Sequence, residues 1–345
     1  MLSYSDSTMR AFVVSGPRRC SVEEVESPHA DRGQVVVDIE RVGVCGTDVE
    51  FFTGEMAYLQ QGHAHYPIRL GHEWCGRVAS VGPDVATEWI GVRVTGDTML
   101  GCGRCQRCLS GRHHVCADRF ELGIRGGWPG ALAEQLAVPV SALHKLPATV
   151  DAIAGAMVEP GGSAYRAVDG CGLGTGERLL VVGPGTIGLL AVLFAQARGL
   201  EVHVLGVEPD TLEFARTLGV DGAWTASDLP DLAFDAIIDA TNSASIPARA
   251  LDLVEPARRV VYVGLAGTPS NIDTRTLALK DVTAVGILGG SAGLVGAIAE
   301  YASGRVDPRP LVAATVSLDE IGAVLGGASP SHAGRGPKIQ VDPRP

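Results

Sequence analysis

The chain has 345 residues, which is enough for two domains and too many for one small core. Apolar residue types make up 46% and charged types 19%, a composition typical of globular and not of disordered proteins. Lys and Arg number 28 against 39 Asp and Glu, so the formal net charge is −11 and we expect no general affinity for nucleic acid or anionic membranes.

Two uncharged stretches, residues 179–197 and 282–299, approach the length of a membrane span. Glycines interrupt both, so each is predicted to form a buried strand, a glycine turn and a buried helix. Residues 1–14 contain no basic segment followed by an apolar one, and we therefore expect no secretory signal and a cytoplasmic location. In a reducing compartment, the eight cysteines favour metal binding over disulfides.

The first part of the chain, from residue 9 to about 150, is predicted to be rich in β-strands. Its short runs of alternating apolar and polar residues lie between Gly, Pro and Asp turns. The clearest of these runs are residues 10–14, 34–42, 75–81 and 133–138. The Pro-rich residues after about 306 return to a mixed character and are expected to rejoin this first part.

From about residue 151 the pattern changes to alternating strands and helices. Such alternation predicts a parallel sheet that helices cover on both faces. The expected strands are residues 178–183, 201–207, 235–240 and 259–263. The expected helices are residues 186–199, 210–218 and 246–254. The sequence therefore predicts an α/β protein of two domains, the first rich in strands and the second a doubly wound sheet.

Four cysteines lie within fifteen residues, at Cys102, Cys105, Cys108 and Cys116. Tetrahedral Zn²⁺ takes four such thiolates, and short loops between them can wrap one ion. The residues between them are mostly polar or basic, so a metal and not an apolar core would hold the segment together. The alternative is two disulfides in a surface lobe. Because four protein ligands saturate the ion, the sequence predicts a structural zinc site.

A second metal site is predicted from residues that lie far apart in the sequence. A catalytic zinc needs about three protein ligands and one open position. Cys45 and His72 supply two ligands, and the third is either Glu73 or Glu159. The spacing does not choose between these two carboxylates. Taken singly, a Cys is more often a small core residue and a His-Glu pair a satisfied polar pair.

Two residues of the Cys45 segment are expected to support this zinc. Asp48 is the natural acceptor for the ring N–H of His72. Thr47 places a hydroxyl beside the open position of the metal.

The segment Gly183-Pro184-Gly185-Thr186-Ile187-Gly188 follows a predicted strand and opens a predicted helix. It has the G-x-G-x-x-G spacing of a dinucleotide-binding loop. The first glycine allows the tight turn, the second lets a pyrophosphate approach, and the third packs the helix on the strand. The N-terminus of the helix supplies N–H groups to the phosphates.

The residue expected to bind the adenosine ribose is Glu208, twenty positions after Gly188. Its charge would repel a 2′-phosphate, and neither Lys nor Arg follows until Arg216. The sequence therefore favours NAD(H) over NADP(H).

The motifs in this order resemble the zinc-dependent medium-chain dehydrogenases of the alcohol dehydrogenase superfamily, over about residues 9–345. The matching segments are GVCGTD (43–48), GHEWCG (71–76), GCGRCQRC with the following Cys116 (101–116), VEP (158–160) and VVGPGTIG (181–188). The resemblance implies a GroES-like catalytic domain, residues 1–157 completed by 306–345, and a Rossmann NAD(P)-binding domain, residues 158–305. Zinc-free quinone reductases of the superfamily lack the four cysteines and are disfavoured.

Within the family, the sequence is most similar to the polyol, sugar and aminocyclitol dehydrogenases. This similarity implies that Glu121 and Glu50 contact the substrate and that Gly264 and Leu288 line the coenzyme site. Glu50 stands where many relatives carry a histidine that ends a proton relay, so a carboxylate or solvent must finish the proton path. Relatives that use NAD often place Asp at the position of Gly206, which leaves Glu208 to take that role.

The expected function is hydride transfer between a secondary alcohol of a polyol, sugar or aminocyclitol and NAD(P), with two zinc ions per chain. Family members assemble as homodimers or homotetramers, and the same is expected here. One alternative is a simple alcohol or threonine-type zinc dehydrogenase. An alternative of another class is a non-catalytic protein that binds zinc and nucleotide.

Overall fold

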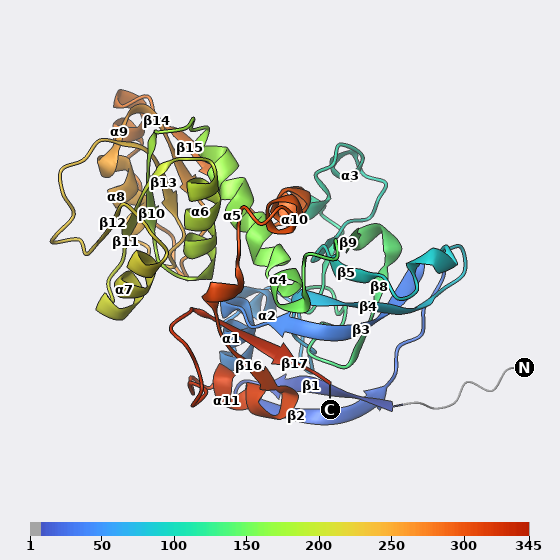
Figure 1. Cartoon of the computed structure of the whole chain (residues 1–345). Coiled ribbons are helices and arrows are strands. Elements are labelled where there is room, and N and C mark those ends of the chain that lie inside the picture. Colours follow the sequence, from blue (N-terminus) through green and yellow to red (C-terminus); the bar gives the residue numbers. More distant parts are fainter. Residues whose placement is uncertain (1–7, 345) are drawn as a thin grey trace, which may run out of the picture. The chain divides into compact units, whose positions relative to one another are not determined.

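The structure is a computed structural model that describes residues 8–344. Residues 1–7 and 345 lie outside it, and with them half of the N-terminal segment searched for a secretory signal. The chain forms two compact units (Figure 1). Of the described residues, unit 1 comprises 8–159, 312–334 and 338–344, and unit 2 comprises 160–311 and 335–337. Among the described residues no helix is both long and apolar enough to cross a membrane.

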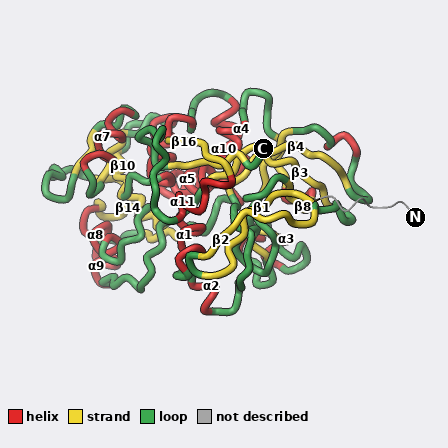
Figure 2. The backbone as a smooth tube through the Cα atoms, turned by 90° about the horizontal axis from the view of Figure 1, so that it is seen from below, coloured by secondary structure: helices red, strands yellow, loops and turns green. Residues whose placement is uncertain are grey.

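Unit 1 is built mainly from strands and loops, as the tube in Figure 2 shows. Its main sheet has the strand order β16-β17-β3-β4-β5-β9, and β8 pairs with β3 as well. Two strand pairs, β1-β2 and β6-β7, complete the unit. The strands are β1 (Thr8–Gly16), β2 (Arg19–Glu26), β3 (Gln34–Gly43), β4 (Glu73–Val81), β5 (Arg93–Gly96), β6 (Met99–Leu100), β7 (Phe120–Glu121), β8 (Gln135–Pro139), β9 (Leu143–Lys145), β16 (Val312–Ser317) and β17 (Lys338–Asp342).

Short helices connect these strands, and the segment after residue 311 supplies the last two strands of the sheet. The helices are α1 (Gly46–Thr53), α2 (Ala57–Gln60), α3 (Gln106–Leu109), α4 (Ala152–Ala156) and α11 (Ile321–Leu325). Strand β17 pairs with β3 antiparallel, with Val341 opposite Val42. Alternating apolar residues of β3, including Val35, Val37 and Ile39, are fully buried in the core of the unit.

Unit 2 is a six-stranded parallel sheet in the order β12-β11-β10-β13-β14-β15. Figure 1 shows α5 and α6 on one side of this sheet and α8 and α9 on the other. The strands are β10 (Arg178–Val182), β11 (Glu201–Leu205), β12 (Gly222–Trp224), β13 (Phe234–Asp239), β14 (Val254–Tyr262) and β15 (Thr283–Gly286). The helices are α5 (Val158–Cys171), which begins in unit 1, α6 (Thr186–Ala197), α7 (Pro209–Thr217), α8 (Ile246–Leu253), α9 (Thr274–Leu279) and α10 (Leu294–Ala302).

The doubly wound sheet predicted from the sequence is confirmed. The central strands β10 and β13 are almost entirely buried, as parallel strands covered on both faces must be. On one side of the sheet, the Phe194 ring of α6 stacks on Tyr301 of α10 and meets the edge of Tyr165 from α5. These aromatic contacts fix three helices together.

Two predictions for unit 2 need correction. The strand expected at the start of residues 282–299 exists as β15, but it is exposed and not buried, because it lies at the edge of the sheet. The strand expected at residues 259–263 begins earlier, at Val254, directly after α8. Glu255, Pro256 and Arg258 on its exposed part concealed this extension from the hydrophobic pattern.

Candidate metal and coenzyme sites

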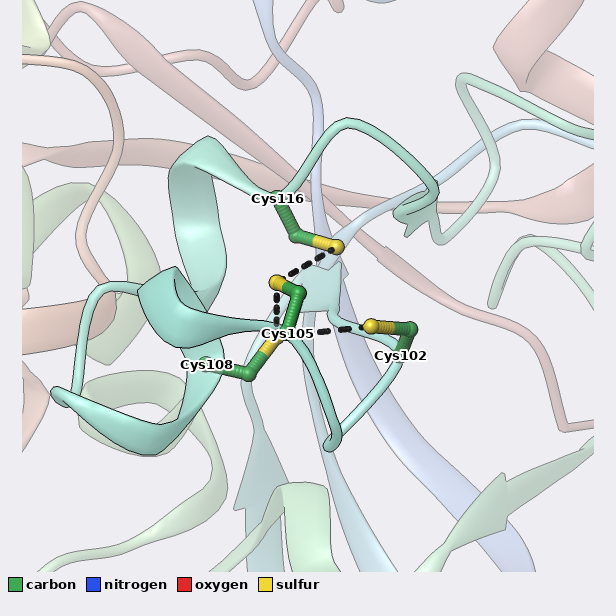
Figure 3. A group of neighbouring side chains, drawn as sticks. All are labelled: Cys102, Cys105, Cys108 and Cys116. Atoms are coloured by element: carbon green, nitrogen blue, oxygen red, sulfur yellow. Dashed lines mark hydrogen bonds between the residues drawn. The ribbon is translucent and has the colours of Figure 1, made fainter.

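The four clustered cysteines converge around one point in unit 1 (Figure 3). The Sγ of Cys105 lies 3.6 Å from that of Cys108 and 3.7 Å from that of Cys116, and the Sγ atoms of Cys102 and Cys108 are 4.0 Å apart. Four sulfurs bound to one Zn²⁺ at about 2.3 Å lie about 3.8 Å from one another. The cysteines are free thiols in the structure, so the geometry fits a tetrahedral metal and not the alternative of two disulfides.

Local structure brings these sulfurs together. Cys105 caps the N-terminus of α3 and Cys108 follows one turn later, so both side chains lie on the same side of the helix. At Gly101 a Cβ atom would lie only 2.8 Å from the Sγ of Cys108, and no larger residue fits there. Backbone amides of Arg104 and Cys105 lower the pKa of Cys102 to about 6, which favours its thiolate at neutral pH.

The second predicted site also assembles, from two separate segments of unit 1. Ligand atoms of Cys45, His72 and Glu73 all lie within 4.8 Å of one another. Cys45 caps the N-terminus of α1, where the positive end of the helix dipole favours a negative side chain. His72 and Glu73 enter from the start of β4, and both are buried. Two buried ligands of the right chemistry beside a partly accessible thiol fit a zinc site with room for a substrate.

Asp48 connects the two sequence motifs of this site. Its Oδ2 accepts a hydrogen bond from the backbone N–H of Cys45 at 2.9 Å, and its Oδ1 accepts one from the N–H of Gly71 at 3.3 Å. Its Oδ1 also lies 3.8 Å from Nδ1 of His72, which has no hydrogen-bond partner among the described residues. The fully buried Asp48 carboxylate therefore holds the Cys45 and His72 segments against each other.

Glu159 lies near this cluster but outside the group of three. It is half-buried at the start of α5, and loss of hydration raises its pKa to about 7; the charge of His72 opposes this effect and that of Glu73 adds to it. Burial lowers the pKa of His72, but the hydrogen bond to Cys45 and the charges of Asp48 and Cys45 together outweigh it and raise this pKa well above its usual value. Glu73 belongs to the group of three converging ligands and Glu159 lies outside it. Glu73 is therefore nearer to Cys45 and His72 than Glu159 is.

One charged residue of this site was missed by the sequence reasoning. Lys338, at the start of β17, donates from Nζ to Oε2 of Glu73 at 2.6 Å and to the carbonyl oxygen of Val44 at 2.8 Å. The side chains of Lys338 and Glu73 are only 3% and 2% exposed. Lys338 opens the segment KIQVD, whose alternation of polar and apolar residues indicates a strand but not a buried ammonium.

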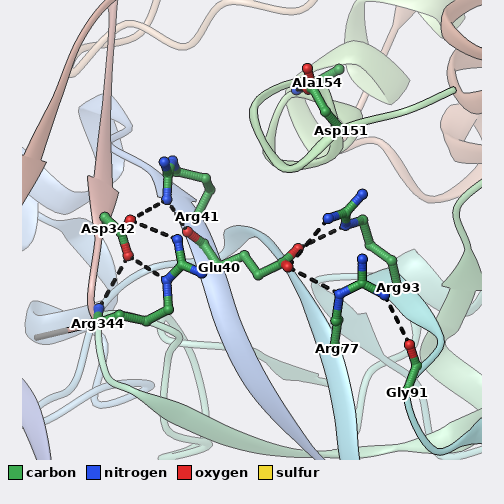
Figure 4. Close-up of polar contacts among 9 residues, drawn as sticks. All are labelled: Glu40, Arg41, Arg77, Gly91, Arg93, Asp151, Ala154, Asp342 and Arg344. Atoms are coloured by element: carbon green, nitrogen blue, oxygen red, sulfur yellow. Dashed lines mark hydrogen bonds and ion pairs between the residues drawn. The ribbon is translucent and has the colours of Figure 1, made fainter. Parts of the chain in front are cut away.

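Ion pairs anchor the strand that carries Lys338 (Figure 4). Arg41 of β3 forms an ion pair with Asp342 of β17, and the same carboxylate accepts from Arg344 at 2.8 Å. Gln340 donates to the carbonyl oxygen of Ile153 at 2.9 Å. Strand β17 is therefore held along its whole length.

The residue before Arg41 is the centre of a second group of charges in Figure 4. Oε2 of Glu40 accepts from Nε of Arg93 at 2.7 Å, and Oε1 accepts from Nε of Arg77 at 3.2 Å. Burial works against the Glu40 anion, but the two guanidinium groups keep its pKa below the usual value. Glu40 thus ties β3 to β4 and β5.

We expect Glu40→Gln to lower the free energy of unfolding by about 1–2 kcal/mol at pH 7, because two partly buried guanidinium groups then lose their counter-charge. Since folding lowers the pKa of Glu40, its contribution is present above the unfolded pKa of about 4.5 and is lost as the pH falls through the folded value. Thermal unfolding measured between pH 7 and pH 3 should therefore show that the melting temperatures of the variant and the parent become equal at low pH. Glu88→Gln, an exposed site, is the control, and a gap that persists at pH 3 would contradict the prediction.

The remaining residues predicted for catalysis lie in different environments. Thr47 and Glu50 stand three positions apart on α1, where their side chains neighbour each other, and Glu50 is exposed. Although Glu50 is exposed, partial loss of hydration of its carboxyl, and then the charge of Glu55, raises its pKa. Glu121 is buried in β7, and its Oε1 accepts from Nε of Arg119 at 2.7 Å and from the hydroxyl of Tyr58 at 3.2 Å.

The glycine-rich loop of unit 2 joins β10 to α6, in the context that a dinucleotide-binding loop requires. Gly183 has φ +97°, and a Cβ at Gly188 would lie 2.0 Å from the carbonyl oxygen of Gly183. A Cβ at Gly185 would meet no atom within 4 Å, so the space beside it is open to a ligand. Thr186 and Ile187 form the first turn of α6, whose N–H groups face this space.

Gly206, directly after β11, lies against the glycine-rich loop. A Cβ at Gly206 would lie 2.9 Å from the ring of Pro184, inside the glycine-rich loop. Glu208, two residues further on, is exposed and stands at the N-cap of α7. At Gly264 a Cβ would lie 1.9 Å from the carbonyl oxygen of Thr241, so this turn also requires glycine. Leu288 is 38% exposed.

Comparison with known sequences places this chain among dehydrogenases. Residues 31–148 match the family described as "Alcohol dehydrogenase GroES-like domain", and residues 186–303 match "Zinc-binding dehydrogenase". The chain is 30% identical to a 2-dehydro-3-deoxy-L-galactonate 5-dehydrogenase of Pseudoalteromonas atlantica, over 90% of this chain and 92% of the relative. It is 29% identical to a sorbitol dehydrogenase of Halalkalibacterium halodurans (81% and 83%) and 26% identical to an L-threonine 3-dehydrogenase of Rhizobium rhizogenes (90% and 93%).

Solved structures agree with this placement. An alcohol dehydrogenase from E. coli CFT073 complexed with NADH superimposes with a TM-score of 0.88 at 26% identity, covering 97% of this chain and 99% of that one. A putative zinc-binding dehydrogenase from Sinorhizobium meliloti bound to NADP gives a TM-score of 0.88 at 27% identity, with 98% and 100% covered.

The chain belongs to the zinc-containing medium-chain alcohol dehydrogenase family, with a GroES-like domain and a Rossmann domain. By family it is an NAD(P)-dependent zinc dehydrogenase that acts on CH–OH groups.

Proposed function

We propose that this protein oxidises a secondary alcohol of a polyol, sugar or aminocyclitol, or reduces the corresponding ketone, with NAD(H). The observation that carries the proposal is the convergence of Cys45, His72 and Glu73 in unit 1. In this proposal unit 1 holds a catalytic zinc on these residues and a structural zinc on the four clustered cysteines, and unit 2 holds the coenzyme on its glycine-rich loop. A zinc ion held by Cys45, His72 and Glu73 would supply a Lewis acid for the substrate hydroxyl, and a bound NAD(P) would supply the hydride acceptor.

The residues around Cys45 then have distinct tasks. Asp48 fixes the Cys45 and His72 segments through their backbone N–H groups, which orients both ligands before substrate arrives. The Oγ1 of Thr47 receives the proton of the substrate hydroxyl. Glu50, three residues further along α1, accepts it in turn and releases it to solvent, and its raised pKa suits this acceptor role. This path replaces the histidine relay of other family members.

Glu121 is the residue that we propose for recognition of neighbouring hydroxyl groups. A short chain of hydrogen bonds joins the next residue, Leu122, to the backbone of His72. Leu122 donates to the carbonyl oxygen of Thr98, and the Thr98 hydroxyl donates to the carbonyl oxygen of His72. Arg119 and Tyr58 hold the Glu121 carboxylate, so that acceptor and donor groups stand side by side, as recognition of a polyol requires.

A panel of substrates at fixed NAD⁺ tests the proposal, with zinc content measured on the same preparation. Two zinc ions per chain and faster NADH production with polyols, sugars or aminocyclitols than with ethanol, 2-propanol or L-threonine would support it. L-Threonine is included because the L-threonine 3-dehydrogenases of several Rhizobium species match nearly the whole chain. Preference for threonine or a simple alcohol would establish the rival dehydrogenase, and coenzyme binding without turnover on the whole panel would favour a non-catalytic role.

We expect wild-type protein to bind NADH at least about tenfold more tightly than NADPH, because the Glu208 carboxylate accepts from ribose hydroxyls and repels a 2′-phosphate. Glu208→Gln should reduce the difference between the NADH and NADPH affinities, mainly because NADPH then binds more tightly. Fluorescence titration with each reduced coenzyme measures this without a known substrate. Glu213→Gln, an acid one turn further along α7, is the matched control. Equal affinity of the wild type for both coenzymes would contradict the prediction.

We also propose that the protein assembles as a homodimer or homotetramer in the cytoplasm, where a reducing environment keeps cysteines available for metal binding. Strand β15 lies at the edge of the unit 2 sheet and is largely exposed, and a sheet edge of this kind can pair with another chain. Leu279 and Val295 near this strand in the sequence are 88% and 67% exposed. The molecular mass by light scattering tests the assembly.

A further inference from the structure

The pair formed by Lys338 and Glu73 has features that a general structural role does not explain. Both side chains are almost completely buried, and they meet at 2.6 Å. A buried ion pair is seldom more stable than apolar residues of the same size, because both charges lose their hydration. Glu73 is also one of the three groups that converge on the predicted catalytic metal site.

The sheet is shaped to allow this contact. Strands β17 and β4 do not neighbour each other, because β3 lies between them. Lys338 therefore reaches across β3 to meet Glu73. It does so at the end of β3, where Gly43 stands opposite Glu73 in the register. A Cβ at Gly43 would lie 2.1 Å from Oε2 of Glu73, so this glycine makes the room that the carboxylate occupies.

The contact restricts what Glu73 can offer to a metal. Its Oε2 accepts a hydrogen bond from the Lys338 ammonium. This ammonium also donates to the carbonyl oxygen of Val44, the residue before Cys45, and this second contact fixes its position. A carboxylate held at one oxygen binds a metal through the other oxygen alone. Without the ammonium, both oxygens of Glu73 could turn toward the cation, and a bidentate carboxylate would fill the coordination position that a substrate oxygen needs.

We propose that Lys338 is a positioning residue of the catalytic centre, which limits Glu73 to one metal-binding oxygen and so keeps a coordination position open for substrate. This inference rests on the proposed zinc-dependent function.

The test compares Lys338→Met, Lys338→Arg and Gln340→Met, each loaded with Co²⁺ in place of the zinc at the Cys45 site. The visible absorption of Co²⁺ reports coordination number, and subtraction of the Cys45→Ser spectrum removes the contribution of the four-cysteine site. In Lys338→Met we expect weaker absorption, since five-coordinate Co²⁺ absorbs less than tetrahedral Co²⁺. We also expect its kcat to be about 10- to 100-fold lower than that of the parent. A chelator should remove the metal from this variant no faster than from the parent.

Lys338→Arg, which keeps the charge, should retain the parental spectrum and most of kcat. Gln340→Met is the matched control, because Gln340 is a buried polar residue of the same strand that contacts the Ile153 carbonyl oxygen and not the metal ligands. It should lower the melting temperature without changing the Co²⁺ spectrum. If Lys338→Met does not fold, Lys338→Met with Glu73→Gln removes both charges and should restore intense, tetrahedral absorption.

Three results would overturn the inference. Lys338→Met could keep the parental spectrum and kcat, or it could lose its metal rapidly and regain activity when Co²⁺ is added. The double variant could also absorb as weakly as Lys338→Met. Failure of the proposed function gives a different result. In that case the wild-type protein turns over no alcohol, while the Co²⁺ spectra still report whether Lys338 controls Glu73.

Discussion

Replacing Cys45 by serine should lower alcohol turnover at least about 1000-fold while NADH still binds with unchanged affinity. The Lewis acid chemistry of a bound zinc is worth several kcal/mol of transition-state stabilisation, and about 4 kcal/mol corresponds to a factor of 1000 in rate. A serine hydroxyl is a poor zinc ligand at neutral pH, because it remains protonated. The coenzyme loop belongs to unit 2 and shares no residue with the Cys45 cluster, so NADH titration should be unaffected.

The control for this experiment is Cys20→Ser. Cys20 is a half-buried thiol of unit 1 that belongs to neither metal-binding group. It should keep two zinc ions per chain and parental turnover, whereas Cys45→Ser should keep only one. Parental turnover in Cys45→Ser would show that the Cys45 cluster is not the catalytic centre.

The second large effect is expected at the four-cysteine site. Cys105→Ser removes the sulfur that lies within 3.7 Å of two others, and we expect it to abolish metal binding at this site and to unfold residues 101–118 locally. A structural zinc contributes on the order of 10 kcal/mol to the folding of small metal-dependent segments. The polar residues of this segment bury too little apolar surface to replace that contribution.

Hydrogen exchange and zinc analysis measure this effect. In Cys105→Ser the backbone amides of residues 101–118 should exchange much faster than in the parent, and one zinc per chain should be lost. Exchange in the unit 2 sheet should not change, because β10 and β13 contain none of these ligands. Parental exchange of residues 101–118 with one zinc missing would show that the segment folds without metal.

The parts of the site that the sequence predicted well are those whose residues are close in the chain or carry a strict spacing. The four cysteines lie within fifteen residues and Gly183 to Gly188 within six, so their geometry follows from local structure. The ion pair between Glu121 and Arg119 could also have been predicted from their spacing. Residues two apart in an extended segment point to the same side, which favours the ion pair that the structure shows.

Other features depend on the order of strands and were not predictable from local pattern. Lys338 meets Glu73 across 265 positions of sequence, and nothing in the segment KIQVD indicates a buried ammonium. Strand β15 was predicted to be buried because its residues are uncharged, but burial depends on its place at the sheet edge. The closeness of Glu73 to Cys45 and His72 likewise became visible only in the coordinates, because Glu73 and Glu159 follow equally plausible motifs.

The discontinuity of unit 1 has a consequence for how the protein acquires its metals during synthesis. Strands β16 and β17 follow nearly all of unit 2 in the chain, so a ribosome must translate residues 160–311 before Lys338 can reach Glu73. The four-cysteine ligands, in contrast, emerge together within one short segment. We therefore expect the two ions to load in a fixed temporal order, the structural one on the nascent chain and the catalytic one only after β17 has joined its sheet.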